Sequence, residues 1–173
     1  MHRVAAMLRR RTERFHMVIH ALFGIICGYI VHNIFVNVNL GNLIFWGVSG
    51  SLLPDIDHFL YFYVYGRKDV YSKVVRAYIK DKNFRKLLLF WRFNHKKNGA
   101  LYSHNILSLI IALYMFGYFV QIKDMPTLSV VALAWFSHYA FDIFEDFLFM
   151  KHLNPNWYLK FNKKATKKDL VIP

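Results

Sequence analysis

The chain separates its apolar and basic residues into alternating segments. Four apolar runs lie at about 15–36, 43–65, 100–122 and 128–150, and none of them contains a Lys or an Arg. Each run has about the 20 residues that a helix needs to cross the hydrocarbon core of a bilayer. The sequence therefore predicts an all-α fold: a polytopic membrane bundle of four transmembrane helices. We expect residues 1–173 to form a single membrane-embedded domain.

The basic residues fall on alternate connections between these runs. Of the 23 Lys and Arg residues, 5 precede the first run, 11 lie in the loop at 66–98 and 6 lie in the tail at 151–173. The short turns at 37–42 and 123–127 contain only Lys123. Under the positive-inside rule, this distribution places the amino end, the 66–98 loop and the carboxyl end in the cytoplasm.

Apolar residues also recur at helical spacing inside the 66–98 loop, with basic residues in the gaps. The two sets are Tyr71, Val74, Val75, Tyr78 and Ile79, and then Phe84, Leu87, Leu88 and Trp91. This pattern predicts an interfacial basic helical insertion, with its apolar face in the lipid and its bases toward anionic headgroups. A solvated pair of helices is the alternative. Nucleic-acid binding is not expected, because it would leave the apolar face unexplained.

Ionisable residues occur within the apolar runs, where burying each of them costs at least about 2.5 kcal/mol. The predicted topology places all of them in the cytoplasmic half of the bilayer. They are His20, Asp55, Asp57, His58, His104, His138, Asp142 and Glu145. Neutral imidazole and carboxylate are the usual protein ligands of zinc, manganese and iron. A shared depth for such groups on four helices predicts a metal site.

The spacing in the fourth run supports this prediction. His138 and Asp142 are four residues apart and share one face of a helix, and Glu145 follows on that face. Without Glu145, the four runs together offer seven candidate ligands. That number fits either one ion with a surrounding layer of polar residues, or two ions about 3.5–4 Å apart.

The second run carries its charged residues beside a proline. Asp55 and His58 are three residues apart and share a helix face, and Pro54 is expected to break the helix there. Asp57 points elsewhere on a regular helix. We expect it either to orient an imidazole or, if the backbone is irregular, to bind the metal itself.

The remaining histidines have weaker claims on a site. His16 precedes His20 by four residues and faces the same way, so it is a candidate additional ligand. His32 is expected at the far membrane interface. His95 and His152 are expected to be solvated.

The string LLPDIDH at 52–58 resembles the LLPDxDH signature of the membrane-bound metal-dependent hydrolases, the YdjM-like family. Three further pieces resemble family elements and occur in the family's order: HALFG at 20–24, YSHN at 102–105 and FSHYAFD at 136–142. Ser103 stands where the family has a threonine, and Gly99-Ala100 where it has His-Arg.

The resemblance implies a metal-dependent hydrolase in a prokaryotic cell membrane. It carries over the metal-site residues His20, Asp55, Asp57, His58, His104, His138 and Asp142. The expected cofactor is zinc, with manganese or iron as alternatives, present as one or two ions. Membrane lipids with anionic headgroups are the expected partners.

The chemistry expected of such a site is hydrolysis of an ester or phosphoester bond in a lipid or lipid-linked substrate. A bound metal would lower the pKa of water toward about 7, and Asp57 or Glu145 would act as the general base. The alternative is a non-catalytic metal-binding membrane protein, in which the metal ties helices together or is translocated, as protons could also be.

Overall fold

The computed structural model describes residues 2–94, 101–122, 124–150, 153, 155–158, 168 and 170–173. The regular secondary structure of these residues is helical and includes no strand, which confirms the all-α prediction. The fold divides into two compact units. Unit 1 consists of Met1–Pro54 and Asn105–Leu153, and unit 2 consists of Asp55–His104 and Asn154–Pro173.

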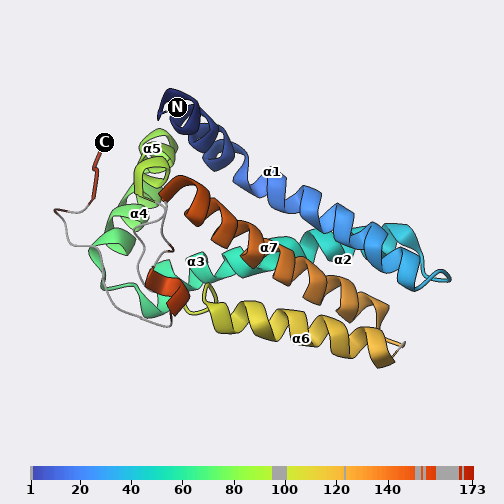
Figure 1. The fold of residues 1–173 in the computed structure, drawn as a ribbon. Coiled ribbons are helices and arrows are strands. Elements are labelled where there is room, and N and C mark those ends of the chain that lie inside the picture. The colour runs from blue at the N-terminus through green and yellow to red at the C-terminus, as the bar shows by residue number, and fades with distance from the viewer. Residues whose placement is uncertain are drawn as a thin grey trace. The chain divides into compact units, whose positions relative to one another are not determined.

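Unit 1 is a helical bundle (Figure 1). Its described helices are α1 (His2–Ile34), α2 (Leu40–Leu52), α6 (Ile106–Ile122) and α7 (Pro126–Met150). The helix α7 packs against each of the other three, and α1 also packs along α2. The α1–α2 and α6–α7 connections lie at the same end of unit 1 (Figure 1). Successive crossings of a membrane would have this antiparallel order.

Two helices of unit 1 are long and apolar enough to cross a membrane. By length and composition, they are Phe15–Ile34 within α1 and Pro126–Leu148 within α7. The helix α6 is also apolar but has 17 residues. Large apolar side chains such as Leu22 and Ile110 are more than half exposed, as they would be against lipid. Among the described residues two spans are thus supported, and the four-span topology stays a prediction.

The run at 43–65 forms several short elements, and the helix breaks at Pro54 as predicted. The helix α2 is followed by a 3-10 turn (Leu53–Asp55), the short helix α3 (Ile56–Leu60) and a π-helical turn (Tyr61–Tyr65). Pro54 accounts for the interruption, because it has no amide hydrogen to donate to the preceding turn. The LLPDIDH residues therefore lie on irregular backbone.

The third helix begins later than expected. Residues 101–105 are not helical, and α6 begins at Ile106. Asn105 ends the irregular segment, because its side-chain oxygen accepts a hydrogen bond from the Ser108 amide at 2.9 Å and so caps the helix. His104, which falls inside the apolar run predicted as a span at 100–122, therefore lies in the non-helical segment before α6.

Two glycines let α1 and α2 approach closely. A Cβ atom on Gly24 would lie 2.5 Å from the backbone oxygen of Gly47, and a Cβ atom on Gly47 would collide with the backbone oxygen of Gly24. Gly50 of α2 lies close to α7 in a similar way, because a Cβ atom on Gly50 would lie 3.1 Å from the Cα atom of Val131. Small residues at helix crossings are common in membrane proteins because they allow close backbone packing.

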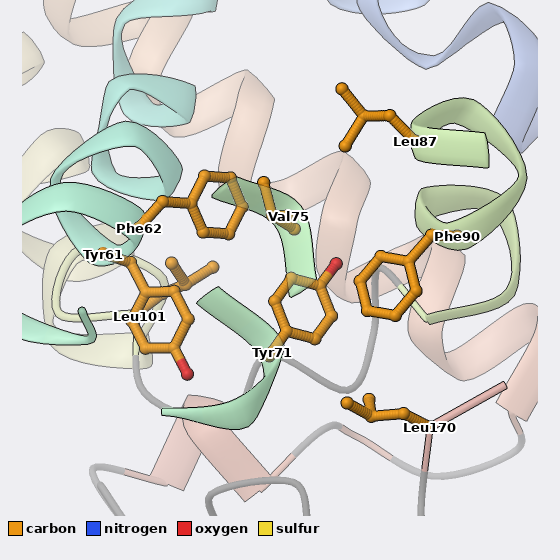
Figure 2. Packing of buried hydrophobic residues seen from close by; sticks show 8 residues of the cluster. All are labelled: Tyr61, Phe62, Tyr71, Val75, Leu87, Phe90, Leu101 and Leu170. Atoms are coloured by element: carbon orange, nitrogen blue, oxygen red, sulfur yellow. The ribbon is translucent and has the colours of Figure 1, made fainter. Parts of the chain in front are cut away.

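Unit 2 contains α4 (Val70–Lys80) and α5 (Phe84–Asn94), which confirms helices in the 66–98 loop. Its core consists of Tyr61, Phe62, Tyr71, Val75, Leu87, Phe90, Leu101 and Leu170 (Figure 2). Residues expected to enter lipid, such as Tyr71, Val75 and Leu87, are instead buried in this protein core. Tyr61 and Phe62 of the π-helical turn pack against these residues in the core, whereas Phe84 and Leu88 of the same predicted apolar faces are exposed.

The end of the chain belongs to this core. The side-chain amide of Asn94 donates hydrogen bonds to the backbone oxygens of Phe90 and Val171, each at 2.8 Å. Its oxygen accepts one from the Val171 amide at 2.9 Å. Asn94 thus pairs with Val171 much as a neighbouring strand would, and Leu170 is held among the core residues.

Candidate metal centre

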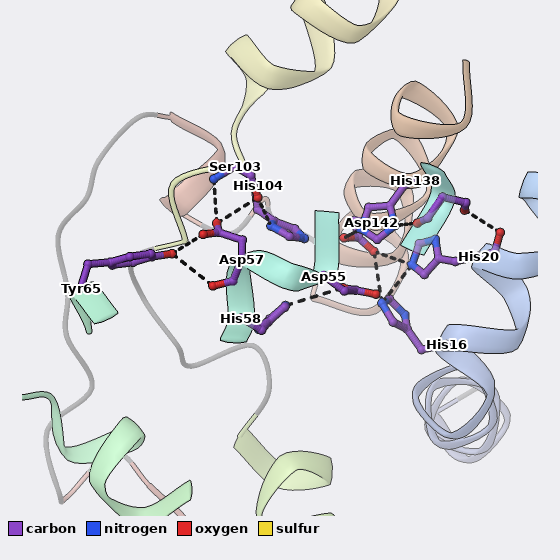
Figure 3. A network of polar contacts seen from close by, with 11 residues as sticks. His16, His20, Asp55, Asp57, His58, Tyr65, Ser103, His104, His138 and Asp142 are labelled. Atoms are coloured by element: carbon purple, nitrogen blue, oxygen red, sulfur yellow. Dashed lines mark hydrogen bonds and ion pairs between the residues drawn. The ribbon is translucent and has the colours of Figure 1, made fainter. Parts of the chain in front are cut away.

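Four polar side chains meet between α1 and α7 of unit 1 (Figure 3). His16 and His20 come from successive turns of α1, and His138 and Asp142 come from successive turns of α7. His20 and His138 are completely buried and Asp142 is 6% exposed. We call these four residues the unit 1 cluster. Burial of such groups in a helical bundle requires that they share protons or a cation.

The ligand atoms of this cluster have the separations of a metal site. Nε2 of His16 and Nε2 of His20 are 3.0 Å apart. Oδ1 of Asp142 lies 3.6 Å from the first and 3.5 Å from the second. Tetrahedral bonds of about 2.0–2.2 Å place neighbouring ligand atoms roughly 3.3–3.6 Å apart. His16, His20 and Asp142 could therefore hold one ion together.

His138 is oriented by the backbone of α2. Its Nδ1 lies 2.7 Å from the carbonyl oxygen of Ser51, which can only accept a hydrogen bond. The neutral ring therefore carries its hydrogen on Nδ1, and Nε2 presents a lone pair 3.4 Å from Oδ2 of Asp142. Metal-binding histidines commonly donate their second nitrogen to a backbone carbonyl in this way.

Ser51 also contacts the other side of the cluster. Its hydroxyl donates a hydrogen bond to the backbone oxygen of His20 at 2.6 Å. The rings of His20 and His138 are stacked, with centroids 3.8 Å apart. Ser51 thus fixes the relative positions of both histidines, and the close α1–α2 contact at Gly24 and Gly47 makes this possible.

A second group of ligand atoms lies in unit 2 and consists of Asp55, His58 and His104 (Figure 3). Nε2 of His58 lies 3.8 Å from Oδ1 of Asp55, and the rings of His58 and His104 are 5.3 Å apart. The side chains of His58 and Asp55 are 29% and 19% exposed. These three residues could hold an ion, and catalytic zinc sites typically have three protein ligands and a bound water. We call these three residues the unit 2 cluster.

Asp57 adjoins the unit 2 cluster but faces away from its ligand atoms. Oδ1 of Asp57 accepts a hydrogen bond from the Tyr65 hydroxyl at 2.5 Å. Oδ2 accepts two from Ser103, one from the amide at 2.8 Å and one from the hydroxyl at 2.9 Å. From the sequence, Asp57 was expected either to orient an imidazole or to bind the metal itself. These contacts agree with the orienting role.

Residues 16–155 match the sequence model of the YdjM inner membrane protein family. The chain belongs to this family. Neither the search of curated proteins nor the search of solved structures found a match. The family description places the protein in an inner membrane, and the two long apolar helices agree with that location.

The YdjM match spans both clusters, from His16 on α1 to residues beyond Asp142 on α7. The donor set of imidazole and carboxylate groups fits zinc, manganese or iron.

Two further ionisable residues of unit 1, Glu145 and His32, are not members of the unit 1 cluster. Glu145 is 2% exposed and follows Asp142 by one turn of α7. Among the described residues, the possible ligand atoms of His16, His20 and Asp142 lie within 4.8 Å of one another. Glu145 is not part of this group. His32 donates a hydrogen bond from Nδ1 to the backbone oxygen of Val38, 3.0 Å away.

His95 and His152 lie outside the described residues. Three residues of the two clusters' surroundings were not predicted from sequence: Ser51, Tyr65 and Ser103. Ser103 is part of the YSHN element at 102–105 and gave a weak signal. Ser51 and Tyr65 gave none, because serine and tyrosine are common in apolar helices.

Proposed function

We propose that this YdjM-family protein is a divalent-metal-dependent hydrolase of the inner membrane. Its substrate is an ester or phosphoester of a lipid or lipid-linked molecule, approached from the cytoplasmic side. The observation that carries the proposal is the unit 1 cluster, in which two imidazole nitrogens and a carboxylate oxygen lie 3.0 to 3.6 Å from one another in a buried position. Such a set is costly to bury without a cation.

The residues present fit a zinc ion, and manganese or iron are alternatives. A bound divalent ion supplies Lewis acidity and a water with a pKa near about 7. In unit 1, His16, His20 and Asp142 would hold it, and the Ser51 carbonyl keeps Nε2 of His138 turned toward Asp142. In unit 2, Asp55, His58 and His104 offer a second set of donors with partial access to solvent.

Two carboxylates are candidates for the general base. Both oxygens of Asp57 already accept hydrogen bonds from Tyr65 and Ser103. Its three contacts favour a positioning role, so we propose Glu145 as the base. Replacing Glu145 with Gln would then lower the rate of hydrolysis while leaving the metal content unchanged.

The surface of unit 2 supports a lipid substrate with an anionic headgroup. Exposed basic side chains are frequent on it: Arg67, Lys68, Lys73, Lys80, Lys82, Arg85 and Lys86. The helix α5 also exposes Phe84, Leu88 and Phe93 beside these bases. Basic groups near an anionic leaflet contribute about 1 kcal/mol each, and exposed apolar side chains can enter the lipid.

The test uses the full chain purified in detergent and loaded with zinc. The substrates are a diacylglycerol phosphate and a fatty acyl ester in mixed micelles, with release of phosphate or fatty acid measured. Hydrolysis of one of them that is lost in Asp142→Asn and kept in His32→Ala supports the proposal. Equal hydrolysis by a metal-stripped sample, or no hydrolysis of either substrate by zinc-loaded protein, would reject it.

One observation favours a second candidate, a metal that only holds the bundle together. The unit 1 cluster offers four protein donors, and closed four-ligand zinc sites are usually structural. A zinc-loaded protein without hydrolase activity that loses its cooperative thermal unfolding on chelation would support this alternative.

A further inference from the structure

We propose that Tyr65, Asp57 and Ser103 form a hydrogen-bonded chain that positions His104 for metal binding. In this assignment Asp57 acts on the metal through Ser103 and is not itself a ligand. The inference rests on the proposed metal-dependent function. All four residues belong to unit 2, so the chain of contacts lies within one compact unit (Figure 3).

The contact between Asp57 and Ser103 fixes the segment that carries His104. Oδ2 of Asp57 accepts both the amide hydrogen and the hydroxyl hydrogen of Ser103, at 2.8 and 2.9 Å. The Ser103 backbone and side chain are therefore both held by one carboxylate oxygen. Because His104 is the next residue, its position in the non-helical segment before α6 follows from this clamp.

The same contacts determine which nitrogen of His104 is available. A serine hydroxyl has one hydrogen, and Ser103 gives it to Asp57. Nδ1 of His104 lies 3.0 Å from the Ser103 oxygen, which can then only accept from it. The neutral ring carries its hydrogen on Nδ1, and Nε2 keeps the lone pair that a metal requires. A residue that fixes the tautomer of a ligand in this way raises metal affinity.

Tyr65 completes the chain from the other side of Asp57. Its hydroxyl donates to Oδ1 of Asp57, and it accepts from the Tyr102 amide at 3.5 Å. Tyr65 follows Asp57 by eight residues. In a regular α-helix, eight residues rotate about the axis by roughly 80° more than two full turns, which would turn Tyr65 away from Asp57. The π-helical turn at Tyr61–Tyr65 is wider and takes up this excess. The π-helical turn thus allows the Tyr65 hydroxyl to reach Asp57.

The experiment measures zinc affinity of the full chain in detergent, after stripping the metal, by competition with a chelating dye. The ion of interest is the one that His104→Ala releases. We expect Ser103→Ala to weaken its binding by roughly 10- to 100-fold, the usual effect of losing such a partner. Ser103→Thr keeps the hydroxyl and should bind zinc close to the wild-type affinity. Tyr65→Phe should weaken binding, whereas Tyr63→Phe, at an exposed position of the same turn, should not.

A double-mutant cycle separates the two roles of Asp57. If Asp57 acts through Ser103, Asp57→Asn combined with Ser103→Ala loses no more affinity than Asp57→Asn alone. If Asp57 is a ligand, the two losses multiply. Thermal unfolding of the metal-free variants identifies any that do not fold, and Ser103→Thr and Tyr65→Phe then decide the question.

The outcomes distinguish this inference from the proposed function. Wild-type protein that binds no zinc contradicts the metal-dependent function itself. Zinc binding that is unchanged in Ser103→Ala, or multiplying losses in the double mutant, overturns the positioning chain alone.

Discussion

The carbonyl oxygen of Ser51 lies 2.7 Å from Nδ1 of His138, and this contact leaves Nε2 of the ring to face Asp142. A backbone atom of α2 therefore determines the chemistry of a side chain on α7, 87 residues later in the chain. Because the contact uses the backbone, it survives replacement of the Ser51 side chain.

Ser51→Ala tests the side-chain half of this arrangement. The variant loses the hydroxyl that donates to the His20 oxygen, which should lower the free energy of unfolding by about 1 kcal/mol. Its zinc content should match the wild type, since the carbonyl still orients His138. Thermal unfolding and metal analysis in detergent check both statements, with Ser49→Ala as the control. Loss of zinc from a folded Ser51→Ala protein would contradict them.

Gly47→Ala tests the close approach of α1 and α2. The new Cβ atom would collide with the backbone oxygen of Gly24, so the helices must separate, at a cost of about 1–3 kcal/mol. Gly117→Ala on α6 is the matched control, because its Cβ atom would meet nothing within 4 Å among the described residues. A lower melting temperature is expected for Gly47→Ala alone. Equal melting temperatures for both variants would refute the packing argument.

Removal of the metal should destabilise the bundle. An ion present at 100 times its dissociation constant stabilises the folded state by about 2.7 kcal/mol. Chelation should therefore lower the melting temperature, and zinc should restore it. Magnesium should not, because it prefers oxygen ligands and the clusters are rich in imidazole. In Asp142→Asn the response to zinc should be reduced; an unchanged response would argue against a role for Asp142.

The orientation of the chain can be tested by thiol labelling. The test uses Asn37→Cys and Lys73→Cys, each in a Cys27→Ala background. Position 37 lies in the turn between α1 and α2, and position 73 is an exposed position of α4. The distribution of basic residues predicts that a membrane-impermeant reagent labels the first in intact cells and the second only after lysis. Labelling of the cysteine at position 73 from outside would reverse the topology.

The sequence predicted those features that depend on one helix at a time. The spacing of His138 and Asp142 correctly placed both on one face of α7, and the same rule gave His16 and His20 a common face on α1. The structure then brings these two faces together within unit 1. His16, which the sequence ranked as an additional candidate, is a full member of the unit 1 cluster.

Features that depend on contacts between elements could not be predicted. The Asp57–Ser103 contact joins residues 46 positions apart, and no periodicity reports such a pair. The burial of Tyr71 and Leu87 depends on aromatic residues of another element, so their helical spacing fitted lipid and protein equally well. The late start of α6 was readable in principle, because asparagine is a common helix cap.

The most direct measurement is elemental analysis of the detergent-purified protein, with His20→Ala, His138→Ala and Asp142→Asn beside the wild type. The account predicts that the wild type retains zinc, manganese or iron in stoichiometric amount. His20→Ala and Asp142→Asn should lose metal, and His138→Ala should lose part or all of it. The folded control His32→Ala should retain the wild-type amount, because His32 bonds to Val38 at the other end of α1. A wild-type protein without bound metal, or full metal content in both folded His20→Ala and Asp142→Asn, would contradict the central claim.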